Sequence, residues 1–189
     1  KNTDVLIHFA SIAHTNYKKK HDFKRNIFTQ NYGSTIYLAN LSISLNLKKF
    51  VFISSTKSLD NEFKKLSISQ LKKLNTNNFY GKIKRITEME LQKIFLKTKT
   101  KLLIIRPSLV YGPQAKGNLL FLKNYISKSP LVILPYINNK RSLIHIDNLI
   151  KSIDFVVFKN KLDINNYTFA DDNDYSFHEI CVSINRFYK

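Results

Sequence analysis

The segment Phe50-Val51-Phe52-Ile53-Ser54-Ser55 places four apolar residues directly before two hydroxyl side chains. A short, unbroken apolar run is typical of a strand that is covered on both faces, as in a parallel sheet. The run Asp4–Ala10 precedes it with the same form, and Leu102–Ile105 follows it and ends at Arg106-Pro107. These segments predict three neighbouring buried strands.

The stretches between these strands predict two helices and a loop. Residues 79–96 have helical periodicity, and residues 56–77 are polar and broken, so we expect them to form a surface loop. Residues 26–45 carry apolar side chains at helical spacing, namely Ile27, Ile36, Leu38, Leu41 and Leu45. Strands that alternate with helices indicate an α/β fold, a Rossmann-like doubly wound parallel sheet. Ligands bind such sheets beyond the carboxyl ends of the strands.

The pattern changes after Pro113. Short helices and strands are predicted from there on, over residues 117–129, 131–134, 141–145, 148–158 and 167–170. Asp147 and Ser176 are the predicted N-caps of the last two helices. We therefore expect a core of residues 1–112 and a smaller, interleaved portion of residues 113–189.

The composition limits the class of protein. A net charge of +18 at pH 7 is compatible with nucleic-acid binding. The lysines are scattered over predicted loops and helix ends, so we interpret them as solvated surface residues and expect no nucleic-acid partner. The single cysteine, Cys181, excludes a disulfide framework. No apolar run could span a bilayer, so we expect no membrane partner and a cytoplasmic location.

Tyr80 and Lys84 lie one helical turn apart at the start of a predicted helix. A free phenol has a pKa of about 10 and is a poor base at neutral pH. A nearby ammonium favours the phenolate, so we expect Lys84 to lower the pKa of Tyr80 and Tyr80 to transfer a proton. The spacing alone is weak evidence, because Tyr136 and Lys140 share it. The serine-bearing strand that precedes Tyr80 favours the first pair.

The order of these motifs resembles the extended short-chain dehydrogenases/reductases, within the NAD-dependent epimerase/dehydratase group that acts on sugar nucleotides. The resemblance covers nearly the whole chain. Its motifs, in chain order, are Asn31-Tyr-Gly-Ser-Thr35, Phe50–Ser55, Tyr80-Gly-Lys-Ile-Lys84, Arg106-Pro-Ser-Leu-Val-Tyr-Gly-Pro113 and the segment Asn139–Leu149.

The resemblance implies a role for each matched residue. Tyr80 would move a proton of a sugar hydroxyl, Ser55 would orient the same oxygen, and Lys84 would hold the nicotinamide ribose. NAD would be the cofactor, with NADP as an alternative. The implied cofactor contacts are Phe9, Ala10, Asn31, Ser54, Tyr80, Lys84, Pro107 and Ser108.

The resemblance also implies binding partners. A UDP-sugar would be bound by Ser55, Asn118 and Arg141, within the substrate-binding portion that residues 113–189 would form. We expect no metal ion. We expect a homodimer that forms through the helices over residues 26–45 and 79–98.

Two departures from the family's motifs exclude some of the reactions that its members catalyse. Its 4,6-dehydratases carry Asp-Glu directly after the active-site threonine, whereas Thr56-Lys57 follows Ser55 here. Its decarboxylases need a nearby glutamate that Lys57-Ser58 does not supply. We therefore expect a 4-epimerase that acts on a UDP-hexose or UDP-N-acetylhexosamine through a 4-keto intermediate. A 4-keto-sugar-nucleotide reductase, a non-catalytic dinucleotide-binding protein and a basic nucleic-acid-binding domain are the alternatives.

The family's Gly-x-x-Gly-x-x-Gly turn is absent from this sequence, whose four glycines are Gly33, Gly81, Gly112 and Gly117. The resemblance therefore predicts a fragment without the first three strands of the fold. We expect the isolated chain to bind NAD very weakly or not at all, because this turn cradles the pyrophosphate. We also expect it to expose a sheet edge and apolar faces.

Overall fold

The computed structural model describes residues 3–12, 26–113, 118–128, 139–159 and 165–188. The chain divides into two compact units. Unit 1 comprises Lys1–Arg106 and Val157–Thr168, and unit 2 comprises Pro107–Val156 and Phe169–Lys189. Within the described ranges, every helix is too short or too polar to cross a membrane.

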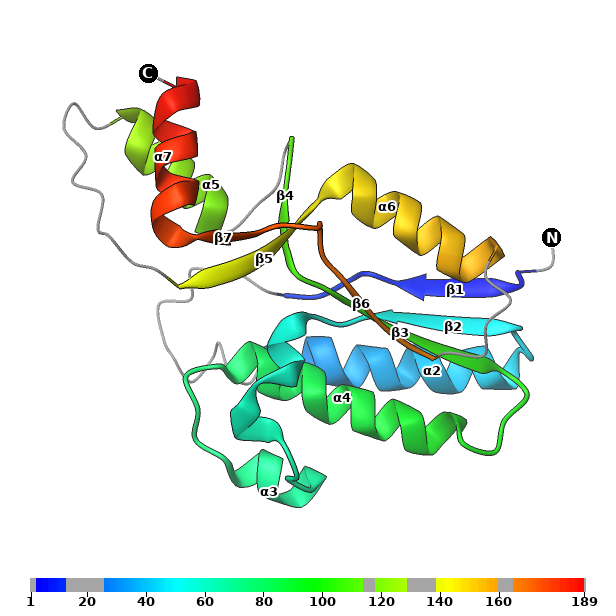
Figure 1. Cartoon of the computed structure of the whole chain (residues 1–189). Helices are drawn as coiled ribbons and strands as arrows, with labels where there is room; N and C mark the ends of the chain where they lie inside the picture. Colours follow the sequence, from blue (N-terminus) through cyan, green and yellow to red (C-terminus); the bar gives the residue numbers. More distant parts are fainter. Residues whose placement is uncertain (1–2, 13–25, 114–117, 129–138, 160–164, 189) are drawn as a thin grey trace. The chain divides into compact units, whose positions relative to one another are not determined.

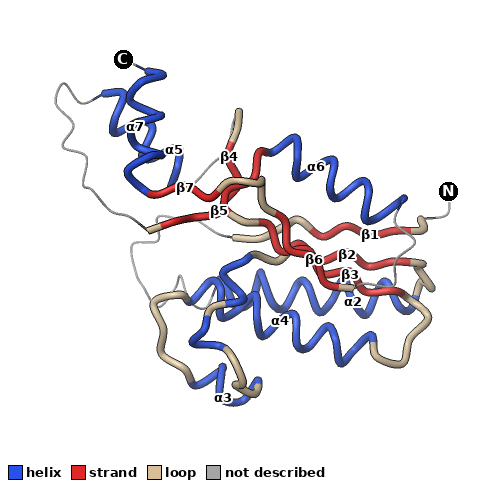
Figure 2. Tube along the Cα trace, in the orientation of Figure 1, coloured by secondary structure: helices blue, strands red, loops and turns tan. Residues whose placement is uncertain are grey.

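Unit 1 is built on a sheet with the strand order β1-β2-β3-β6 (Figures 1 and 2). The strands β1 (Val5–His8), β2 (Lys49–Ile53) and β3 (Lys101–Pro107) run parallel. The fourth strand, β6 (Asn166–Phe169), lies beside β3. The three strands predicted from apolar runs are therefore confirmed. Their carboxyl ends meet at one edge of the sheet, where ligands bind in this class.

The strands differ in how far they are buried. All residues of β2 and β3 are buried except the lysines at their starts. In β1 only His8 is buried, while Val5, Leu6 and Ile7 are half-buried. The expectation that this strand is covered on both faces is therefore wrong. The reason is that β1 is an edge strand of the described sheet, which confirms the predicted exposed edge.

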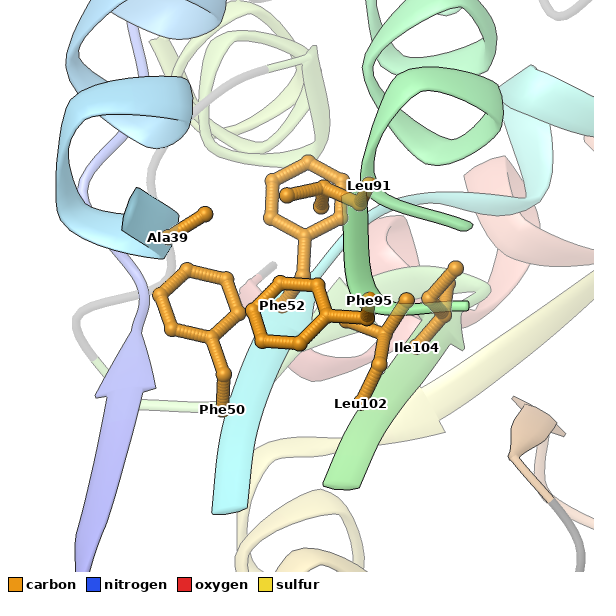
Figure 3. Close-up of a cluster of buried hydrophobic side chains, with 7 residues drawn as sticks. All are labelled: Ala39, Phe50, Phe52, Leu91, Phe95, Leu102 and Ile104. Atoms are coloured by element: carbon orange, nitrogen blue, oxygen red, sulfur yellow. The ribbon is translucent and has the colours of Figure 1, made fainter. Parts of the chain in front are cut away.

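Two helices cover one face of this sheet (Figure 1). They are α2 (Ser34–Ser44), which continues a π-helical segment over Phe28–Gly33, and α4 (Phe79–Phe95). The rings of Phe50 and Phe95 stack with centroids 5.5 Å apart. The cluster between helices and strands, drawn in Figure 3, comprises Ala39, Phe50, Phe52, Leu91, Phe95, Leu102 and Ile104. This core fixes both helices against β2 and β3.

The buried face of α2 agrees only in part with the predicted apolar face, because Ile36 and Leu38 pack against the core while Leu41 and Leu45 do not. Leu41 is 36% exposed and Leu45 is 61% exposed. The residues that face inward are Thr35, Ala39 and Ser42, at intervals of four and three. Their small side chains let the helix backbone lie close to the large phenylalanines of β2. Apolar periodicity alone could not identify this face, because the large side chains at this contact belong to β2 and not to the helix.

Residues 56–77 are not a surface loop. They form the 3-10 helices η2 (Thr56–Leu59) and η3 (Asn61–Phe63) and the helix α3 (Ile68–Lys73). A capping box begins α3, because Ser67 Oγ accepts from the Gln70 N–H and the Gln70 side chain accepts from the Ser67 N–H. A second core results, which comprises Ile27, Phe63, Ile68, Leu71, Ile83 and Ile86. The segment's lysines and asparagines masked these apolar residues in the sequence.

Unit 2 contains a three-stranded sheet with the order β4-β5-β7. Its strands are β4 (Leu109–Tyr111), β5 (Lys140–His145) and β7 (Asp174–Ser176); β4 is parallel and β7 antiparallel to β5. Its helices are α5 (Asn118–Lys128), α6 (Ile146–Asp154), which a π-helical turn over Phe155–Lys159 continues, and α7 (Phe177–Tyr188). The strand at residues 141–145 is confirmed, whereas β4 and β7 were not predicted. The predicted apolar segment 131–134 lies outside the described residues.

The two predicted N-caps of unit 2 have different outcomes. Ser176 is confirmed, because its Oγ accepts from the Glu179 N–H at 3.1 Å and Glu179 Oε2 accepts from the Ser176 N–H at 2.6 Å. The prediction that Asp147 is an N-cap is wrong, because the N-cap of α6 is His145, whose side chain accepts from the Asp147 N–H. Asp147 lies instead in the first turn, where a carboxylate complements the helix dipole.

Asp171 connects three elements of unit 2. Its carboxylate accepts from the Tyr111 hydroxyl at 3.0 Å, from the His145 N–H at 2.9 Å and from Asn148 Nδ2 at 2.8 Å. These donors come from β4, β5 and α6. Asp171 therefore holds the sheet and the start of α6 together.

Candidate functional site

Ser55, Tyr80 and Lys84 belong to two segments of unit 1 that pack together. Ser55 follows β2 and caps η2, because its Oγ accepts from the Lys57 N–H at 3.3 Å. Tyr80 and Lys84 lie in the first two turns of α4, which Asn78 caps by accepting from the Gly81 N–H. Contacts between η2 and α4 bring the segment of Ser55 to the helix of Tyr80.

Lys84 is buried next to β2, with 3% of the residue exposed. Its Nζ donates to the carbonyl of Ile53 at 2.8 Å. The same Nζ lies 4.6 Å from the ring centroid of Phe52 and 5.7 Å from that of Tyr80. Burial lowers the pKa of Lys84 to about 8, while the negative charge of Glu88 acts in the opposite direction. The ammonium is therefore held in one place by a carbonyl and two aromatic faces.

The phenol of Tyr80 does not behave as predicted. Burial raises the pKa of Tyr80, and a hydrogen bond with the Ser11 side chain opposes this rise. The prediction that Lys84 lowers the pKa of Tyr80 is therefore wrong for this structure. The ammonium is directed to the Ile53 carbonyl and lies closer to Phe52 than to Tyr80.

Asn31 holds the segment that follows β1. Its Nδ2 donates to the carbonyl of Ile12 at 2.8 Å, and its Oδ1 accepts from the Ile12 N–H at 2.7 Å. One turn later, the Thr35 hydroxyl bonds to Nε2 of the buried His8 at 2.9 Å. Phe9 and Ala10 lie in the segment that Asn31 holds, and both are exposed.

Glu88 binds more partners than the sequence indicated. Its carboxylate is fully buried and accepts from Nε and Nη2 of Arg106 at 2.9 and 2.8 Å. The hydroxyls of Ser54 and Ser58 donate to its Oε1 at 2.5 and 2.7 Å, and Nη1 of Arg85 lies 3.5 Å from its Oε2. We call these five residues the Glu88 network. The only sequence signal for it is an acidic residue one turn after Lys84.

Gly81 allows α4 and η2 to approach closely. A Cβ at this position would lie 2.3 Å from the Lys57 carbonyl oxygen and 2.5 Å from Asn78 Oδ1. Since backbone must then move, we expect Gly81→Ala to lower the free energy of unfolding by about 1–3 kcal/mol. Urea denaturation followed by circular dichroism measures this change.

Gly33 provides the matched control for Gly81→Ala. It has helical dihedral angles, φ −58° and ψ −50°, and no described atom outside its chain neighbours and its own helix backbone lies within 4 Å of the position that a Cβ would take. Gly33→Ala should therefore raise the free energy of unfolding by about 0.4–1 kcal/mol. Equal effects of the two substitutions would contradict the close approach at Gly81.

The low pKa of Lys84 makes stability depend on pH. The folded value of about 8 lies below the ordinary value of 10.5, so the unfolded chain binds more protons between these values. Stability conferred by this residue therefore rises with pH through that window. Relative to Lys84→Met, wild type should gain about 3 kcal/mol of unfolding free energy from pH 7 to pH 10.5. Denaturation of both proteins across this range measures it, and a constant difference would contradict the burial of the charged amine.

The other predicted site residues belong to unit 2 or to its border. Pro107 ends β3, and Ser108 follows it with a buried Oγ that has no hydrogen-bond partner among the described residues. Arg141 is exposed on β5, opposite Tyr175 of β7. Asn118 begins α5, and its side chain lies outside the described part of the chain. Tyr136 also lies outside it.

The order of strands and motifs matches a known family. The model of the NAD dependent epimerase/dehydratase family matches residues 1–168. This chain belongs to that family. The resemblance inferred from the motifs is therefore confirmed, and the conclusion does not depend on the role of any single residue.

Relatives in the epimerase/dehydratase family agree with this assignment. The chain is 33% identical over 156 residues to a UDP-glucose 4-epimerase of Vibrio cholerae, and the match covers 81% of this chain and 47% of that protein. The chain thus spans about half the length of this curated relative.

Solved structures confirm the Rossmann-like α/β fold. A UDP-glucose 4-epimerase from Thermotoga maritima, crystallised with UDP-glucose, matches with a TM-score of 0.74 and 16% identity over 98% of this chain and 61% of that chain. A UDP-glucuronic acid 4-epimerase from Bacillus cereus, in complex with UDP-glucuronic acid and NAD, matches with a TM-score of 0.76 and 22% identity over 97% and 59%.

Proposed function

We propose that this chain carries the proton-transfer site of an NAD-dependent sugar-nucleotide 4-epimerase. Its substrate is a UDP-hexose or UDP-N-acetylhexosamine, and the reaction passes through a 4-keto intermediate. The observation that supports this proposal is the packing of the Ser55 segment onto the helix that carries Tyr80 and the buried Lys84. The match to a UDP-glucose 4-epimerase supports the substrate class.

Each of the three residues has one role. Tyr80 exchanges a proton with the sugar oxygen, and the raised pKa of its buried phenol keeps it protonated and ready to donate at neutral pH. Ser55 binds the same oxygen and orients it. One of the three N–H groups of the Lys84 ammonium donates to the Ile53 carbonyl. The other two can donate to ribose hydroxyls.

The residues of this chain are suited to bind part of a dinucleotide. NAD, when bound, supplies the acceptor and donor of the hydride. Lys84 and Tyr80 are the proposed polar contacts for its ribose. The Ser108 hydroxyl, which has no hydrogen-bond partner among the described residues, is a further proposed donor. Phe9, Ala10 and Pro107 are proposed apolar or backbone contacts. Asn31 and Ser54 would contribute only as supports, because their side chains are bonded to Ile12 and Glu88.

The function is tested in a completed enzyme. We define this as a fusion of the chain with the segments of the Vibrio cholerae relative that it does not match, designed to include a glycine-rich turn of the family's form. With NAD, it should interconvert the C4 epimers of a UDP-hexose or UDP-N-acetylhexosamine. Chromatography of the products measures this interconversion. The 189-residue chain alone is the control and should show no more than very weak binding of NAD in calorimetry. No epimer formation by a folded, NAD-bound fusion would contradict the proposal.

One observation favours a second candidate, a 4-keto-sugar-nucleotide reductase. Burial raises the pKa of the Tyr80 phenol, so it stays protonated at neutral pH, and this is the form that would donate a proton to a keto oxygen. A reductase would consume NADH or NADPH in proportion to a 4-keto substrate. An epimerase would show no net consumption of the cofactor.

Arg141 is the proposed contact for the substrate diphosphate, within the proposed substrate-binding portion of residues 113–189. Its guanidinium is exposed on β5 and presents a planar fork of donors that suits phosphate oxygens. In the completed enzyme, Arg141→Lys should raise the KM for the UDP-sugar about tenfold and leave NAD affinity unchanged. Steady-state kinetics measures both, with Lys140→Arg as a control for charge at the neighbouring position. An unaltered KM would remove Arg141 from the phosphate site.

A homodimer through α2 and α4 is proposed as well. Tyr37, Leu41 and Leu45 leave an exposed apolar face on α2, with Tyr37 68% exposed. Burying such side chains between two copies would stabilise the pair. Sedimentation of the completed enzyme at several concentrations determines its oligomeric state.

A further inference from the structure

The chain on either side of Ser55 is bound by α4. Before Ser55, the Ile53 carbonyl accepts from Nζ of Lys84 at 2.8 Å, and the Ser54 hydroxyl donates to Glu88 Oε1 at 2.5 Å. The two residues directly before Ser55 are therefore both hydrogen-bonded to side chains of α4.

Two further bonds follow Ser55. Nδ2 of Asn78, at the start of α4, donates to the Lys57 carbonyl at 3.1 Å. The Ser58 hydroxyl donates to the same Oε1 of Glu88 at 2.7 Å. Since α4 also carries Tyr80, a single helix determines where both catalytic candidates lie.

Glu88 contributes two of these four attachments through one oxygen atom. Arg106 pairs with both of its carboxylate oxygens, so the buried negative charge already has its counter-charge. The bonds from Ser54 and Ser58 are additional, and hydrogen bonds to a charged acceptor are stronger than neutral ones. A carboxylate needed only for an ion pair would not require two hydroxyls from positions that flank Ser55.

We infer that Glu88 is a positioning residue whose carboxylate holds Ser54 and Ser58 and thereby fixes the Ser55 hydroxyl relative to Tyr80. Removing either serine bond loosens the turn between them and lets the Ser55 hydroxyl leave its orientation. The catalytic consequence of this inference rests on the proposed function. Its structural part concerns this chain alone.

Ser58→Ala tests the structural part without disturbing the charge of Glu88, whose pairing with Arg106 remains. Ser42→Ala is the matched control, because Ser42 is equally buried and donates to the Ala39 carbonyl at 2.7 Å, but lies on α2. In the 189-residue chain, hydrogen exchange of the amides of residues 54–58 should accelerate about tenfold in Ser58→Ala and stay at the wild-type rate in Ser42→Ala. Equal exchange in the two variants would overturn the inference.

The catalytic part is tested in the completed enzyme. Ser58→Ala should lower kcat about tenfold with an unchanged KM, whereas Ser42→Ala should leave both constants at the wild-type values. A purely structural role would lower the amount of folded enzyme in both variants and would not lower kcat per folded molecule. A wild-type kcat in folded Ser58→Ala would overturn the inference. An inactive parent fusion would contradict the proposed function. Amide exchange in the 189-residue chain would then be the test of whether Glu88 holds the segment around Ser55.

Discussion

Replacing Tyr80 by phenylalanine should lower the turnover of the completed enzyme by about 10²–10⁴, the usual effect of losing a positioned acid or base. The ring remains, so the cation–π contact with Lys84 and the packing at the start of α4 are kept. Only the hydroxyl that would exchange a proton with the sugar oxygen is lost. Steady-state kinetics measures turnover and calorimetry measures NAD binding, and NAD should still bind, because Lys84, the other proposed ribose contact, is retained.

Tyr37 provides the control for this substitution. It lies on the exposed face of α2, and Tyr37→Phe removes the same hydroxyl from a residue that is not proposed for catalysis. Its turnover should equal that of the parent. Unchanged turnover in Tyr80→Phe would remove Tyr80 from the mechanism, while the family assignment would stand.

Arg106→Met should lower the free energy of unfolding by about 3–5 kcal/mol, because it leaves the fully buried carboxylate of Glu88 without its counter-charge. Methionine has a similar length and keeps much of the packing, so the loss reports the charge rather than a cavity. Of the remaining donors, Ser54 and Ser58 carry no charge, and Arg85 keeps only one longer contact, at 3.5 Å. Urea denaturation of the isolated chain measures the difference.

The exposed pair of Lys48 and Asp4 offers a comparison. Its atoms are 3.1 Å apart, but the two side chains are 73% and 58% exposed. Solvent screens such a pair, so Lys48→Met should change the free energy of unfolding by less than about 1 kcal/mol. A similar loss in both variants would show that burial does not govern the contribution of these ion pairs.

The sequence predicts the central strands well, and the catalytic roles of Ser55, Tyr80 and Lys84 remain proposals. Apolar runs identify β2 and β3 because both strands are buried on both faces, so the run has no polar interruptions. The placement of Tyr80 and Lys84 on one helix was predictable because their spacing is local. The placement of Ser55 was predictable because it directly follows an apolar strand.

Other elements escape prediction for physical reasons. The fully buried residues of α2 are small, and residues 56–77 hold three core residues, Phe63, Ile68 and Leu71, among polar neighbours. The capping box at Ser67 was the available signal for α3. The strand β4 is only three residues long, which is too short for an alternation pattern.

The contacts of Glu88 could not be predicted, because its partners are distant in the chain. Arg106 lies 18 positions away and Ser54 lies 34 positions away. The pKa of Tyr80 was mispredicted for a related reason. The spacing of one helical turn gives the distance to Lys84, but the Ile53 carbonyl and the ring of Phe52 decide where the ammonium points.

The open edge of β1 makes the behaviour of the isolated chain depend on ionic strength. Among the described residues, no strand pairs with the outer edge of β1, and the amides and carbonyls of such an edge can bind the edge of a second copy and begin assembly. A net charge of +18 keeps copies apart at low salt, where repulsion between them is long-ranged. Added salt shortens that range to a few ångströms, so the edges can meet. Precipitation should therefore be promoted by salt, and dilute buffers are the better choice for storing the protein.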